Sequence, residues 1–157
     1  MSIEKIEKAG WIMEKSGEEI LSCGGASDEL ITATERLLGE LPDDYKYFLK
    51  KYGALSFEAE EFYGITKSGL EGQSVPCVIF CTQVARERGD ISKDMIKIKS
   101  SGYGQSFSID ISQINKDGAA PVVETEISYK HDGNKSVIAN SFSEFLLAEI
   151  QNSVDEL

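Results

Sequence analysis

The sequence has few of the features that mark membrane or secreted proteins. Its longest uninterrupted apolar stretch, residues 75–81, is seven residues long and includes a proline, whereas a membrane-spanning helix needs ~18 apolar residues. The first residues mix Glu with Lys, where a secretory signal would have a basic cluster followed by an apolar segment. We therefore expect a cytoplasmic protein that does not enter a membrane.

Cysteine is also scarce. The three cysteines, Cys23, Cys77 and Cys81, cannot all pair with one another, and they are too few for a disulfide framework. Cys77 and Cys81 are four residues apart and would share one face of a helix, but zinc needs three or four ligands, and the remaining donors are the distant Cys23 and a single histidine, His131. Buried, reduced thiols are the favoured interpretation. We expect no bound metal and no cofactor.

Basic residues are outnumbered, with 16 Lys and Arg against 27 Asp and Glu and a net charge of −11. A nucleic-acid surface needs an array of basic side chains to displace counterions from phosphates, so direct nucleic-acid binding is not expected. The acidic excess is largest in residues 106–157, which contain 3 bases and 9 acids. A protein of this charge favours basic partners.

Catalytic patterns are missing as well. His131 lies beside Asp132 in a polar, turn-like segment, without a nucleophile elbow, phosphate loop or paired-acid motif. Residues 102–106 (GYGQS) lack the third glycine of a dinucleotide loop and are typical of a hairpin turn. We expect a surface histidine and no enzyme, with a hydrolase or metal enzyme built on Cys77, Cys81 and His131 as the alternative.

Helical spacing dominates the first third of the chain. An N-terminal helix is followed by a short extended connector, and a second helix begins after Ser27 and ends at Gly39. A third helix begins near Pro42 and ends at Gly53, with an apolar stripe of Tyr45, Phe48, Leu49 and Tyr52. Residues 77–88 predict a partly buried helix, with a strand as the alternative.

The last third favours strands. Apolar residues at 95–98, alternation at 106–111 and two valines at 122–123 predict antiparallel strands joined by turns. Ser141 then begins a C-terminal helix, with Glu144 as its capping-box partner. The predicted fold class is α+β, an antiparallel sheet with N-terminal helices and a C-terminal helix packed against it, in a single domain of residues 1–157.

Acidic residues interleaved with aromatic residues are the strongest sign of a binding surface. Such a cluster spans residues 57–63, and carboxylates beside rings can pair with Lys and Arg while apolar area is buried. Glu124 and Glu126 share one face of a predicted strand, and that face is more acidic still if Asp110 points the same way. A merely solvated surface remains the alternative. The expected partner-binding residues are Glu58, Glu60, Glu61, Tyr63, Asp110, Glu124 and Glu126.

Four segments carry a family resemblance. The strings LGELPDDYKYFLKKYGALSF, SFSIDIS, APVVE and IANSFSEFLLAEI occur in this order, and together they resemble the SUKH superfamily over residues 27–150. The match is poor over residues 66–99. The resemblance implies a non-enzymatic α+β domain with no shared catalytic residues.

The same resemblance implies function. Bacterial members neutralise polymorphic or contact-dependent toxins, commonly nucleases, by binding them, and a fungal member is a regulator of cell-wall synthesis that acts as a scaffold. Nucleases present basic clefts, which would attract an acidic inhibitor. We therefore expect a bacterial immunity protein, a monomer or weak homodimer, that occludes a toxin's basic active-site cleft. An intracellular interaction scaffold or regulator is the alternative.

Overall fold

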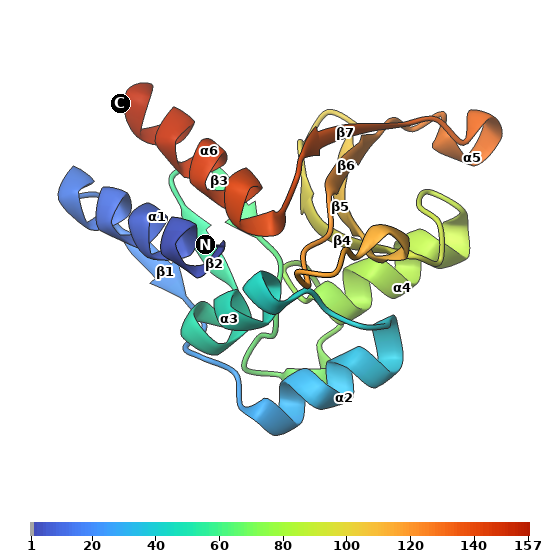
Figure 1. Cartoon of the computed structure of the whole chain (residues 1–157), viewed down its shortest axis with the longest axis horizontal. Coiled ribbons are helices and arrows are strands. Elements are labelled where there is room, and N and C mark those ends of the chain that lie inside the picture. Colours follow the sequence, from blue (N-terminus) through green and yellow to red (C-terminus); the bar gives the residue numbers. More distant parts are fainter. Residues whose placement is uncertain (1) are drawn as a thin grey trace.

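Two antiparallel sheets and the helices around them make up the computed structural model, which describes residues 2–157 (Figure 1). The helices and strands, in chain order, are α1 (Ser2–Ser16), β1 (Ile20–Ser22), α2 (Asp28–Leu38), α3 (Asp43–Tyr52), β2 (Leu55–Phe57), β3 (Glu60–Phe62), α4 (Val78–Arg88), β4 (Met95–Ser100), β5 (Ser106–Asp110), β6 (Val122–Thr125), α5 (Tyr129–Asp132), β7 (Lys135–Ala139) and α6 (Phe142–Asp155). This mixed architecture confirms the predicted α+β class.

The two sheets differ in size. The first has the order β1-β2-β3, and the second is a meander with the order β4-β5-β6-β7. All strand pairs are antiparallel. Just after β3, the Tyr63 N–H donates to the Ile98 carbonyl of β4 at 2.8 Å. This bond ties the small sheet to the edge of the larger one.

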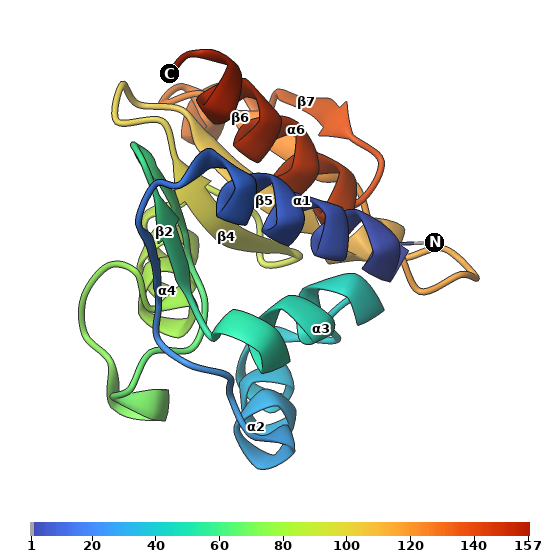
Figure 2. The same ribbon diagram turned by 90° about the vertical axis from the view of Figure 1, so that its left-hand side faces the viewer.

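Helices cover both faces of the four-stranded sheet. α1 and α6 lie side by side (Figure 2), and α6 packs on one face through Phe145, whose ring contacts Phe62 of β3 and Phe107 of β5. α4 packs against the other face, where its Ala85 forms a small apolar cluster with Met95 of β4 and Val123 of β6. The face of the sheet to which a strand residue points therefore determines whether that residue packs against α6 or against α4.

The apolar stripe of α3 lies in the main core, as predicted. Tyr45 and Phe48 are fully buried, and their ring centroids lie 4.9 and 5.0 Å from that of Phe142 at the start of α6. The Tyr45 hydroxyl donates to the Tyr63 carbonyl at 2.8 Å. Gly53 ends the helix with φ of +73°, where an added Cβ would lie 2.4 Å from the Gly24 carbonyl oxygen.

The structure decides the one open alternative among the predicted elements and adds a strand that the sequence did not predict. Residues 78–88 form helix α4, so the strand alternative is wrong. β7 was not predicted, because Val137 and Ile138 are both exposed and give no alternating pattern. Within residues 2–157, every helix is too short or too polar to cross a bilayer.

Candidate functional site: an acidic groove between α6 and the sheet

A groove of about 350 Å³ lies between α6 and strands β5 to β7. Register explains its floor: Phe107 of β5 is opposite Glu124 of β6, so both side chains point to the face that α6 covers. On α6, the helical spacing places positions 144, 145, 148 and 149 on the one face that lies over this floor. The lining residues of this acidic groove are Phe107, Glu124, Ile138, Ala139, Glu144, Phe145, Ala148 and Glu149.

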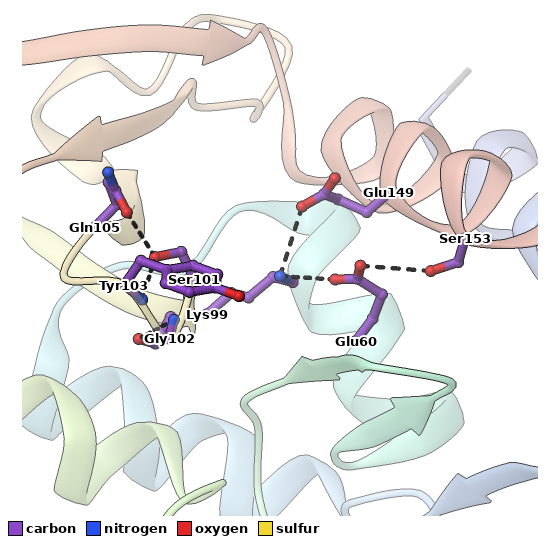
Figure 3. A network of polar contacts seen from close by, with 9 residues as sticks. Glu60, Lys99, Ser101, Gly102, Tyr103, Gln105, Glu149 and Ser153 are labelled. Atoms are coloured by element: carbon purple, nitrogen blue, oxygen red, sulfur yellow. Dashed lines mark hydrogen bonds and ion pairs between the residues drawn. The ribbon is translucent and has the colours of Figure 1, made fainter. Parts of the chain in front are cut away.

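A lysine network forms one end of the groove (Figure 3). Lys99 of β4 is only 7% exposed, and its Nζ lies 2.7 Å from Glu60 Oε2 and 3.7 Å from Glu149 Oε1. The ammonium also lies 5.4 Å from the centroid of Phe107. Ser153 of α6 donates to the other Glu60 oxygen at 3.4 Å. One cation thus joins β3, β4 and α6.

Negative charge exceeds positive charge around the groove. Burial raises the pKa of Glu149, and the neighbouring Lys99 only partly opposes this shift. Glu60 Oε2 is buried, and within the described chain no hydrogen bond supplements its ion pair with Lys99. Glu124 and Glu144 add two more carboxylates. The groove can therefore accept a further cationic side chain.

The structure brings some of the predicted residues to this site. Glu124 lines the groove, and Glu60 belongs to the Lys99 network. Glu58 and Glu61 are exposed on the β2–β3 hairpin, and Glu58 forms its turn with φ of +53°. Glu126 is exposed just beyond β6, where it accepts a 3.4 Å hydrogen bond from Gln105 Nε2.

Two predicted residues are buried elsewhere. Tyr63 is 5% exposed and packs in the core. Asp110 is 1% exposed and faces Met95 on the α4 side of the sheet, opposite to the face of Glu124. The two acids therefore do not form one acidic face.

Asp110 instead anchors the edge strand. Its carboxylate accepts a 2.6 Å hydrogen bond from Lys135 Nζ of β7 and one of 2.6 Å from the Ser112 hydroxyl. Burial alone would raise the pKa of Asp110, but these hydrogen bonds hold it below its ordinary value. Asp110 therefore stabilises the sheet and is not part of an accessible binding surface.

Sequence reasoning missed Glu144 and Glu149 as groove residues. Glu144 was predicted to be the capping-box partner of Ser141, and the observed part of this cap is the 3.1 Å hydrogen bond that the Glu144 backbone N–H donates to the Ser141 hydroxyl. Its side chain, however, lines the groove together with Ala148 one turn later. The available signal was the presence of two acids and an alanine on a helix face that also carries Phe145.

The thiols and the histidine lie apart from the groove. Cys77 and Cys81 are buried and unpaired, and burial raises the pKa of the Cys81 thiol to about 11. His131 is exposed on the single turn α5. Across residues 2–157, no three His, Cys, Asp or Glu side chains are grouped as metal ligands.

Comparison with known families agrees with the fold and with the resemblance of the sequence. The SUKH_6 family model, described as SMI1-KNR4 cell-wall, matches residues 28–146, about three quarters of the chain. The match spans the segment from α2 to the fifth residue of α6, and it includes six of the eight residues that line the groove. At the level of the family, it supports an immunity protein or a related scaffold. The chain belongs to the SMI1-KNR4 family of the SUKH superfamily.

Proposed function

We propose that this chain is a bacterial, cytoplasmic immunity protein that neutralises a cognate polymorphic or contact-dependent toxin by binding it. The toxin is a nuclease, and the immunity protein, a monomer or weak homodimer, occludes its basic active-site cleft. It acts by occlusion and not by catalysis. The acidic groove is the surface that makes the contact.

The excess of carboxylates at the groove carries this proposal. Glu124, Glu144 and Glu149 line the groove and Glu60 lies at its end, and the Lys99 ammonium pairs with two of these four carboxylates, Glu60 and Glu149. A nuclease cleft presents Lys and Arg to phosphates, so its charge is complementary to that of the groove. The net charge of −11 adds long-range attraction to the local match.

Apolar side chains give the groove more than charge. Phe107, Phe145 and Ile138 line it between the carboxylates, and Ile138 is 42% exposed. Apolar contact between charged pairs excludes water, which strengthens those pairs. Both features together suit a specific protein interface better than a solvated acidic surface.

The description of the matching family favours a second candidate. The words SMI1-KNR4 cell-wall fit an interaction scaffold or regulator of the cell-wall-synthesis type. Such a scaffold needs only a binding surface, which the same groove would supply. Deletion of the gene distinguishes the two functions. Loss of a scaffold should change the sensitivity of the cell to agents that damage the cell wall, whereas loss of an immunity protein should make the cell sensitive to a toxin.

Co-expression tests the proposal directly. The immunity function predicts that a toxin domain is encoded beside the gene, and this domain is expressed in bacteria with the wild-type chain or with the Glu124→Lys/Glu144→Lys variant. Wild type should restore growth and co-purify with the toxin, whereas the variant should remain soluble and fail to protect. Equal protection by both chains would place the interface elsewhere, and no protection by wild type would refute the immunity function.

A further inference from the structure

Strand β7 is an edge of the four-stranded sheet, and its outer side is unpaired within the described residues. Four consecutive residues, from Lys135 to Ile138, are exposed. The outer edge of such a strand presents backbone N–H and carbonyl groups that can pair with another chain. Figure 1 shows β7 running along the top of the molecule between α5 and α6.

Apolar side chains stand on both faces of this edge. Val137, opposite Val123, lies on the α4 face and is 61% exposed. Ile138 is 42% exposed and lines the acidic groove on the α6 face. Edge strands that only avoid pairing usually carry charged residues at such positions. An added strand would cover both apolar side chains.

The charge next to β7 selects the chemistry of that added strand. Lys135, the only base of β7, is held by Asp110 at 2.6 Å. Residues 136–157 contain four acids and no base. Two of these acids, Glu144 and Glu149, line the groove beside Ile138, together with Glu124 of β6. A neighbouring basic strand is therefore attracted, and an acidic one is repelled.

We infer that an extended, basic segment of the partner pairs with β7 as a further strand and points its Lys or Arg side chains into the acidic groove. Side chains of a strand alternate between faces, so every second residue of the segment faces α6. An added strand lies ~4.8 Å from β7, which brings long basic side chains toward the groove across Ile138. The other residues of the segment cover Val137. The inference rests on the proposed function only for the identity of the partner as a basic protein.

A synthetic peptide of about ten residues in which Arg alternates with Thr serves as the probe. The control peptide has the same sequence with every second backbone amide N-methylated, which keeps the charge and blocks strand pairing. Affinities are measured by calorimetry at physiological salt, and amide hydrogen exchange of residues 135–139 is followed by NMR. The protein variants are Glu124→Gln/Glu144→Gln and, as a matched control on α2 and just after it, Glu29→Gln/Glu40→Gln.

The parent peptide should bind about tenfold tighter than the methylated one and slow amide exchange in β7. Loss of the two groove carboxylates should weaken binding about tenfold, whereas the matched variant should change it less than about twofold. Equal affinity of both peptides, absence of binding, or protection that falls outside β7 would each overturn the inference.

The outcome can be separated from that of the proposed function. If the peptide leaves β7 unprotected while charge reversal at the groove still abolishes toxin protection, the strand-pairing inference fails and the immunity function stands. If the peptide protects β7 but the chain protects no cell from the neighbouring toxin, the docking edge stands and the immunity function fails.

Discussion

Replacement of Lys99 by Met removes the cation that pairs with both Glu60 and Glu149 at the end of the groove. The long apolar stem keeps its place, because Met has nearly the length of Lys without its charge. Glu60 and Glu149 then lose their shared counter-ion, and Glu60 Oε2 loses its only polar contact among the described residues. The change therefore isolates the charge interaction from the packing.

The size of the loss follows from the burial of the partners. Removal of one partner of a buried ion pair costs ~3–5 kcal/mol. The Glu60 and Glu149 side chains keep 20% and 24% exposure, so water partly solvates the carboxylates that are left. We expect Lys99→Met to lower the free energy of unfolding by about 3 kcal/mol at pH 7, at the lower end of that range.

The loss should depend on pH. Burial raises the folded-state pKa of Glu149 above its ordinary value of 4.5, so the folded protein binds more protons than the unfolded one above that pH. The stability that the folded protein gains by keeping Glu149 protonated is therefore fully present below pH 4.5 and is lost as pH rises through the folded-state pKa. Without Lys99 that pKa rises further, so the variant should lose more stability at pH 7 than at pH 4.5.

Urea denaturation at pH 4.5 and pH 7 measures both effects. Lys50→Met is the matched control, because Lys50 pairs with Asp28 at 3.0 Å in an exposed position and such pairs contribute ~0–1 kcal/mol. Adding Glu149→Gln to Lys99→Met should restore part of the stability at pH 7. A loss no greater than that of the control, or one that is the same at both pH values, would refute the assignment of Lys99 as the counter-ion of a buried network.

Three further variants test the buried core, the anchor of strand β7 and the role of the thiols. Phe48→Ala should lower the free energy of unfolding by ~3–5 kcal/mol, since a fully buried ring leaves a cavity, and an unchanged urea midpoint would contradict this. Asp110→Asn should lower the free energy of unfolding by ~1.5–3 kcal/mol above pH 4, and this loss should vanish as pH falls below the lowered pKa of Asp110. The variant should also speed amide exchange in β7, because the contact with Lys135 is lost. Unchanged exchange would argue against Asp110 as the anchor of that strand. Cys77→Ser with Cys81→Ser should cost ~1–3 kcal/mol per buried hydroxyl yet preserve toxin protection, and a folded variant without protection would point to a role for the thiols.

Local patterns predicted much of the fold. The stripe of α3 follows from helical spacing between Pro42 and Gly53, and the Ser141 cap marks the start of α6. Each of these signals depends on neighbours within one or two turns, which a sequence displays directly. The alternation of residues 106–111 likewise predicted β5.

The site depended on relations that a sequence does not display. The face of Asp110 relative to Glu124 is set by the register of β5 against β6, and a shift by one residue would reverse it. Glu60 meets Glu149 through Lys99, which lies on a third element. β7 gave no signal because its apolar residues are exposed, and that exposure is the feature on which its proposed role rests.

Binding of the toxin domain to two charge-matched variants tests the acidic groove most directly. Glu124→Lys/Glu144→Lys and Glu29→Lys/Glu40→Lys alter the net charge equally, but only the first pair lines the groove. Surface plasmon resonance at two salt concentrations should show that the groove variant loses more than tenfold in affinity, associates more slowly and becomes less sensitive to salt, with the control near wild type. Equal losses in both variants, or an undiminished affinity of the groove variant, would contradict a binding site in the groove.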